Sequence, residues 1–349
     1  MTPNNFDLLR LAAAVQVMLA HTDYYILHKT SIVQFLPGVP VFFFISGFLI
    51  SASWENSSSL LSYAQKRALR IFPALWGVWF FTIVTLLAFY DRDILMQNWI
   101  RLAAWSLMQV TIFQNWNPAF LNGFGTGVMN GALWTISVEI GFYVLVPFIY
   151  FVMRNVRRPN LFLGIVAVLS WLLLISMTML ALKGGGPRWV EWILLSPLPW
   201  FGMFAAGAMA QRYRERIVPM LKGRLLQMLA LYCALAALSK NVPLYPLLRA
   251  DGNAMGVLNF IALCPLILSA AYAAPHIGDR LLQRNDISYG IYLFHGPVIN
   301  LVIYSGLSGA QGYLVVLCVT LLLAVLSWTL LEKKCLSLRD HPMFSRNKI

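Results

Sequence analysis

Charged residues are scarce in this chain, and their scarcity indicates its class. Only 11% of the 349 residues are charged, whereas an ordinary globular domain carries about 25%. Hydrophobic residues make up 59% of the sequence. This composition argues against a soluble domain of any size and is typical of a protein whose surface faces lipid. The sequence therefore predicts an all-α integral membrane protein.

Cysteine is scarce as well, and the spacing of the four cysteines argues against two kinds of site. Cys233, Cys264, Cys318 and Cys335 lie far apart, three of them inside apolar segments. Neither a disulfide framework nor a C-x-x-C metal site is indicated, and we expect no metal and no permanently bound cofactor. Repeats, low-complexity tracts and linkers are also lacking. We therefore expect a single membrane domain over residues 1–349, without a fused extracytoplasmic domain.

Ten apolar runs are long enough, or nearly so, to cross a bilayer at roughly 20 residues per crossing. They lie at about 6–27, 38–54, 71–90, 131–153, 161–182, 194–211, 225–238, 254–273, 287–305 and 312–331. A further stretch, 99–114, is amphipathic because it contains Arg101 and Gln109. It is either an eleventh crossing or a segment at the membrane interface.

The few charges present are mostly positive, with a net charge of +13. A nucleic-acid surface would cluster basic residues with aromatics on a polar face, but here they stand in short links between apolar runs, so no nucleic acid is expected. Ten crossings with a cytoplasmic N-terminus place eighteen of the 26 Lys and Arg in cytoplasmic links and seven outside, as the positive-inside rule requires. Counting 99–114 as a crossing would invert every later loop. We therefore expect 99–114 on the outer side and both termini in the cytoplasm.

Ionisable side chains inside spans are costly and are functional candidates by default. Arg10 and His21 lie 11 positions apart in the first span, close to three whole helical turns, so both project from one face about 16 Å apart. A purely structural role, with Arg10 reaching the headgroups and His21 bonding a neighbouring helix, is equally consistent. Glu139 in the fourth span needs a partner, and His21 or Arg10 are the obvious choices.

Other polar residues admit both structural and functional interpretations. Ser46-Gly47 in the second span allows close helix approach, and helix packing alone would explain the pair. Arg67 and Arg70 share one helical face at a membrane mouth, where they suit a diphosphate or follow from the positive-inside rule. Glu332 ends the tenth span, where we expect a surface ion pair.

Two aromatic-rich segments complete the set. The ninth span contributes a second buried histidine, His295, after Tyr289 and Tyr292. Trp105 and Trp116 lie in the outer segment, where an aromatic belt at the interface is expected.

These segments together resemble the acyltransferase family 3 membrane proteins. Five elements occur in the family's order across positions 10 to 333: Arg10 with ten intervening residues before His21, Phe42-Phe43-x-x-Ser46-Gly47, Arg67-x-x-Arg70, Trp134-x-x-Ser137-x-Glu139, and Ser288-Tyr289-x-x-Tyr292-x-x-His295 with the Glu332-Lys333 ending. Lys333-Lys334-Cys335 departs from the many relatives that place a proline after the basic residue.

The resemblance implies a membrane O-acyltransferase that moves an acyl group, expected to be acetyl, from cytoplasmic acetyl-CoA to a hydroxyl of a cell-surface or exported glycan. His21 would be the general base or would carry the acyl group covalently, and Glu139 would orient it or stabilise its charged form. Arg10, Arg67 and Arg70 would meet the donor phosphates. Residues expected to support the site are Ser46, Gly47, Trp134, Ser137, Tyr292 and His295. On this resemblance Trp105 and Trp116 would stack on the sugar, although an aromatic belt at the interface explains them better.

The resemblance also implies a setting. We expect the bacterial cytoplasmic (inner) membrane, with membrane lipid, acyl-CoA and a glycan acceptor as partners, and a separate protein wherever an extracytoplasmic partner is needed. A transporter or flippase of a glycan or lipid-linked intermediate is the alternative function. It should show repeat symmetry and interrupted helices at matched positions, which this sequence lacks.

Overall fold

The computed structural model describes residues 4–182, 187–241, 250–251, 254–274, 276–283 and 285–338. These residues are helical apart from loops and one short antiparallel pair of strands, β1 (Ala250–Asp251) and β2 (Ala254–Met255). The chain divides into two compact units. The first unit takes residues from 1–13, 34–57 and 138–285, and the second takes residues from 14–33, 58–137 and 286–349.

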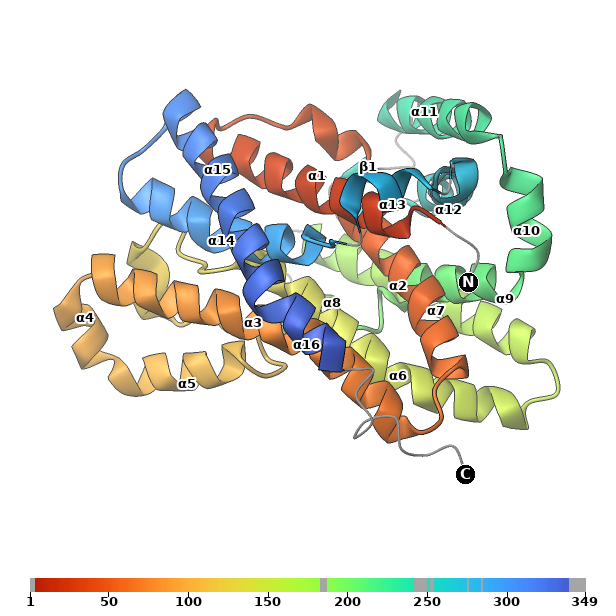
Figure 1. Cartoon of the computed structure of the whole chain (residues 1–349), viewed down its shortest axis with the longest axis horizontal. Helices are drawn as coiled ribbons and strands as arrows, with labels where there is room; N and C mark the ends of the chain where they lie inside the picture. Colours follow the sequence, from red (N-terminus) through yellow and green to blue (C-terminus); the bar gives the residue numbers. More distant parts are fainter. Residues whose placement is uncertain are drawn as a thin grey trace. The chain divides into compact units, whose positions relative to one another are not determined.

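Two helices contribute residues to both units: α1 (Phe6–Ile26) and α6 (Trp134–Asn155). The first unit also contains α2 (Gly38–Glu55), α7 (Pro159–Leu182), α8 (Arg188–Leu194), α9 (Phe201–Arg212), α10 (Arg214–Leu221), α11 (Leu225–Asn241), α12 (Val257–Ala273) and α13 (Ile277–Leu282). Within it, α9 packs against both α2 and α7, and α11 packs against α12 (Figure 1).

The α2–α9 crossing in the first unit depends on two glycines. A Cβ atom on Gly47 would lie 1.9 Å from the carbonyl oxygen of Phe204, and a Cβ on Gly207 would lie 1.9 Å from that of Phe44. No side chain fits at such distances, so glycine on both helices lets the two backbones touch. This is the close helix approach that the sequence predicts at Gly47.

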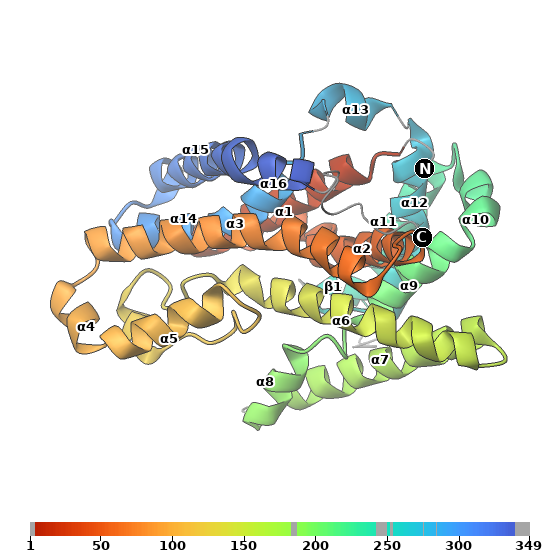
Figure 2. The same ribbon diagram turned by 60° about the horizontal axis from the view of Figure 1, so that its bottom comes forward.

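The second unit is built around the long helix α3 (Leu60–Phe89). Its other elements are α4 (Arg92–Gln97), α5 (Trp99–Gln109), the 3-10 turns η2 (Ala119–Gly123) and η3 (Gly131–Leu133), α14 (Ser288–Tyr304), α15 (Gly309–Ser327), the π-helical turn η4 (Trp328–Glu332) and α16 (Lys333–Ser337). Helix α14 packs against α3 and α15, and α5 folds back along α3 (Figures 1 and 2).

The predicted spans coincide with helices, but not all of these helices are long. Each of the ten apolar runs overlaps a helix, namely α1, α2, α3, α6, α7, α9, α11, α12, α14 or α15. Among the described residues, five helical stretches are long and apolar enough to cross a membrane: Gly38–Glu55, Leu60–Phe89, Gly131–Asn155, Pro159–Ala181 and Gly309–Ser337. The pair Arg214–Leu221 and Leu225–Leu238, bent by 89°, makes a sixth if it is one span.

For the run at 194–211 the reason is length. This run becomes a helix only from Phe201, and the 12 residues of α9 rise roughly 18 Å, whereas a hydrocarbon core is about 30 Å thick. Ten crossings, the single domain and the cytoplasmic termini stay predictions. The basic residues after Leu338, which we place in the cytoplasm, lie outside the described residues.

The amphipathic stretch at 99–114 forms only a short helix. Helix α5 has 11 residues, which rise about 16 Å, too little to cross a bilayer by itself. Its outer-side position stays a prediction.

Candidate functional site

Two histidines of the second unit meet directly. The Nδ1 atom of His21, on α1, lies 2.9 Å from the Nε2 atom of His295, on α14, and the two ring centroids are 5.1 Å apart. His295 is fully buried, and its Nδ1 lies 3.2 Å from the carbonyl oxygen of Ile291, one turn earlier. The structure thus brings together His21, the expected base, and His295, a residue expected to support the site.

The position of His295 follows from how α14 is anchored. Asp286 accepts hydrogen bonds from the backbone N–H (3.1 Å) and the hydroxyl of Ser288 at the start of this helix. Farther along, Gly290 permits close approach to α15, because a Cβ there would lie 2.8 Å from the Cα of Ala324. These contacts hold α14 at its N-terminal half, where His295 stands.

Tyr292 lies one turn before His295 and connects it to the segment around Trp134. Its hydroxyl is 2.7 Å from Thr135 Oγ1, and its ring centroid is 5.9 Å from that of His295. The half-buried Trp134 begins α6, and Ser137 donates to Gln114 Oε1 at 2.5 Å. The supporting residues Tyr292 and His295 therefore lie in one polar cluster with Thr135, which the sequence did not single out.

Glu139 receives hydroxyl partners in the first unit. Its Oε1 accepts from Ser46 Oγ at 3.2 Å and from the Tyr143 hydroxyl at 2.7 Å. Tyr143 stands four residues on in the same helix, where a long side chain reaches back naturally. Ser46, next to the packing glycine, therefore has a polar contact of its own.

The cation expected beside Glu139 is not among its hydrogen-bond partners in the described part of the chain. Arg10 instead forms an ion pair with Asp7, at 3.6 Å, one turn away in α1. Glu139 therefore has hydroxyl partners, one on α2 and one on α6, where the sequence suggests Arg10, and Arg10 has an acidic partner within α1. A pairing of Glu139 with His21, a residue of the other unit, stays a prediction.

The two arginines of α3 differ in their surroundings. Arg70 donates to the carboxylate of Asp286 and lies 5.9 Å from the ring centroid of Tyr289. Arg67 is half-buried one turn earlier. Sequence reasoning missed Asp286, although an acidic residue just before the first serine of an apolar helix is a recognisable helix-start signal.

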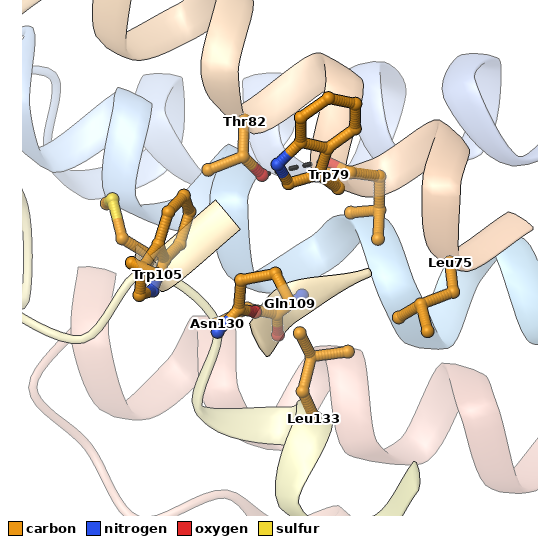
Figure 3. A pocket seen from close by; sticks show the side chains of 9 residues that line it. Leu75, Trp79, Thr82, Trp105, Gln109, Asn130 and Leu133 are labelled. Carbon is orange, nitrogen blue, oxygen red and sulfur yellow. Dashed lines mark hydrogen bonds between the residues drawn. The ribbon is translucent and has the colours of Figure 1, made fainter. Parts of the chain in front are cut away.

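A small cavity in the second unit lies between α3, α5 and the segment before α6 (Figure 3). Its free space is that of about one water molecule. Among the described residues, three buried polar atoms of its lining have no hydrogen-bond partner: Trp79 Nε1, Trp105 Nε1 and Asn130 Oδ1. The Asn130 amide donates to Leu293 O at 2.8 Å. This hydrogen bond places Asn130 beside the backbone of α14.

Trp105 cannot stack on a sugar in this arrangement, because only 2% of it is exposed and it packs in a core cluster with Leu86, Leu121 and Phe124. Glu332 likewise departs from the expected surface ion pair. It is 2% exposed and accepts from Ser327 Oγ at 2.9 Å. The π-helical turn Trp328–Glu332 places it inside the unit, and such turns are frequent at functional sites.

Comparisons with known proteins point to one chemistry. Residues 4–332 match a family model described as an acyltransferase domain. The chain is 32% identical to nodulation protein 10 of Rhizobium leguminosarum, over 96% of this chain and 94% of the relative. It is 27% identical to an O-acetyl transferase of Shigella phage Sf6, over 98% of each. No solved structure gives a significant match.

A longer relative matches over part of its length. The chain is 26% identical to a peptidoglycan O-acetyltransferase of Listeria monocytogenes over 76% of this chain, which covers 45% of that protein.

Proposed function

Because the chain belongs to acyltransferase family 3, we propose that it transfers an acyl group, acetyl in the first instance, from cytoplasmic acetyl-CoA to a hydroxyl of an exported or cell-surface glycan. Family membership makes it an acyltransferase with membrane-spanning helices. The acetyl group and a glycan acceptor are supported by relatives whose names state O-acetyl transfer, one of them to peptidoglycan. The acetyl-CoA donor and its cytoplasmic side are proposed without support from those names.

The observation that carries the proposal is an imidazole held by a second imidazole inside an apolar unit, at the His21–His295 contact. His21 is the general base. Its Nε2 takes the proton of the acceptor hydroxyl while the hydroxyl oxygen attacks the thioester carbonyl carbon. The carbon–sulfur bond then breaks, and the proton passes from His21 to the departing sulfur, so the products are an ester and free CoA thiol. Attack of His21 itself on the thioester, with an acyl-histidine intermediate, is the alternative route.

Glu139 is the second catalytic candidate. Two hydroxyl groups hold its carboxylate, and a carboxylate held in one orientation is suited to stabilise the positive charge that forms on His21 during proton transfer. The contacts from Ser46 and Tyr143 support this role, since hydrogen bonds to a carboxylate also lower the cost of its burial.

The donor phosphates are assigned to Arg10, Arg67 and Arg70. Guanidinium groups suit diphosphates because they present several N–H donors in one plane. Arg70 also engages Asp286 within the second unit.

The membrane setting completes the proposal. Ten crossings, with both termini in the cytoplasm of a bacterial cell and the chain in its inner membrane, give the eighteen-to-seven distribution of basic residues that the positive-inside rule requires. This orientation puts the α3 arginines on the side where acetyl-CoA is available. The acceptor then meets His21 from the opposite side.

A purified-protein assay tests the proposal. The wild-type protein in lipid nanodiscs should release thiol from acetyl-CoA in the presence of extracted cell-surface glycan and should leave acetyl esters on that glycan, detected by mass spectrometry. His21→Ala should abolish both signals while the protein remains folded. The matched control is His276→Ala, since His276 is exposed in the first unit. Wild-type activity in folded His21→Ala would refute the assignment of the base.

A further inference from the structure

We propose that His295 is a positioning residue that sets the tautomer of His21 and so keeps His21 Nε2 free of hydrogen. The inference rests on the proposed function, in which Nε2 is the reacting atom. Two contacts carry it, that of His295 with Ile291 O and that of His295 with His21. All three residues belong to the second unit.

His295 carries its ring hydrogen on Nδ1. Its Nδ1 lies 3.2 Å from a backbone carbonyl oxygen, that of Ile291. A carbonyl oxygen only accepts, so Nδ1 of His295 is the nitrogen that carries hydrogen. The side chain is fully buried, and a second proton would place a cation there with an imidazole rather than a carboxylate beside it. His295 is therefore neutral, and its Nε2 presents a lone pair.

The tautomer of His295 determines which nitrogen of His21 carries hydrogen. His21 Nδ1 stands 2.9 Å from that lone pair, and two lone pairs do not form a hydrogen bond. His21 must therefore donate from Nδ1. A neutral imidazole carries one ring hydrogen, so His21 Nε2 has none. Both routes of the proposed function, proton abstraction and acyl-histidine formation, need this unprotonated nitrogen.

The contact between His295 and His21 should affect kcat more than KM. When His21 Nε2 takes the hydroxyl proton, the ring becomes cationic, and its Nδ1–H bond to His295 becomes charge-assisted and stronger. The gain arises only as charge develops, so it lowers the barrier without tightening substrate binding. Loss of His295 should accordingly reduce kcat and leave KM nearly unchanged.

Two substitutions separate this role from simple packing. His295→Leu fills the space but offers no acceptor, whereas the side-chain carbonyl of His295→Gln can reach the place of Nε2 and accept from His21. The matched control is Val298→Ala, three residues on in α14, where a buried valine loses two methyl groups and no imidazole contact changes.

We expect His295→Leu to lower kcat by about 100-fold, with KM for acetyl-CoA and for the glycan changed by no more than about twofold. His295→Gln should recover roughly tenfold of that loss, because it restores the acceptor without restoring a base. Val298→Ala should keep kcat. A folded His295→Leu protein with the kcat of Val298→Ala overturns the inference, and so does a His295→Gln protein no better than His295→Leu.

A spectroscopic measurement tests the tautomer without any turnover. The chain has five histidines, so ¹⁵N-histidine NMR of the protein in nanodiscs can be assigned by single substitutions. We expect hydrogen on Nδ1 and none on Nε2 of His21 in the wild type, and loss of this preference in His295→Leu. Hydrogen on Nε2 in the wild type overturns the inference. The expected tautomer in a protein that transfers no acetyl group would instead count against the proposed function alone.

Discussion

Two arginines of the same helix, Arg67 and Arg70, have different surroundings in this protein. Arg67 and Arg70 stand one turn apart on α3, yet Arg70 is bound to Asp286, whose side chain is only 10% exposed. Asp286 in turn holds the start of α14. Arg70 therefore helps to hold α3 and α14 together in the second unit, in addition to the donor role proposed for it.

We predict that Arg67→Ala raises KM for acetyl-CoA by about tenfold while kcat is kept, because a phosphate contact made equally in ground and transition states appears in KM. Arg70→Ala should instead lower the free energy of unfolding by about 3 kcal/mol, since it leaves a largely buried carboxylate without its arginine. Steady-state kinetics and thermal unfolding in detergent measure the two effects. An unchanged KM in Arg67→Ala would assign that residue to membrane topology alone.

Glu139 allows a second test at this scale. Glu139→Gln keeps the shape and the hydroxyl contacts but removes the charge, so we expect kcat to fall by about 10- to 100-fold with nearly constant KM for acetyl-CoA. Tyr143→Phe, which removes one of the two hydroxyl donors, should show a smaller loss in the same direction. If both variants keep wild-type kcat, Glu139 has a structural role only.

Among the contacts between helices, the α2–α9 crossing requires glycine at particular positions. Gly47→Ala would put a Cβ 1.9 Å from Phe204 O, a backbone atom that cannot rotate away. The helices must separate, and we expect a loss of about 1–3 kcal/mol or more in unfolding free energy. The matched control is Gly164→Ala in α7, where a Cβ meets nothing within 4 Å. That variant should be neutral or up to about 1 kcal/mol more stable, because alanine favours helix over glycine.

Thermal unfolding of the two glycine variants in the same detergent compares them directly. Equal stability of Gly47→Ala and Gly164→Ala would mean that the crossing tolerates a methyl group and that Gly47 is not needed for it.

At the scale of the whole molecule, the orientation in the membrane is open to measurement. In a protein whose four cysteines are replaced, we predict that Arg92→Cys reacts with a membrane-impermeant thiol reagent in intact cells and that Arg157→Cys reacts only after lysis. The reason is that 71–90 and 131–153 are consecutive crossings that flank 99–114 on the outer side. Labelling of both positions in intact cells would mean that 99–114 or another segment crosses as well.

Much of this protein follows from local sequence. Runs of apolar residues long enough to cross a bilayer become helices, because backbone groups in lipid must bond within their own segment. Every one of the ten predicted runs overlaps a helix, although the run at 194–211 is helical only from Phe201. Helix periodicity also places Arg10 and His21 on one face of one helix. The cost of placing ionisable groups in a membrane marks His295, Glu139 and the α3 arginines as functional candidates.

The partners of those groups were decided by the tertiary structure. His21 meets a histidine 274 residues away, Glu139 meets the hydroxyls of Ser46 and Tyr143, and Arg70 meets Asp286. A buried polar group bonds to whichever complementary atom the packed helix faces bring within about 3 Å. Sequence spacing specifies which face of a helix a residue occupies, but which other face it meets depends on contacts such as Gly47 with Phe204 and Gly290 with Ala324. The sequence therefore identified the ionisable residues that are expensive to bury, and only the tertiary structure determined which residues they contact.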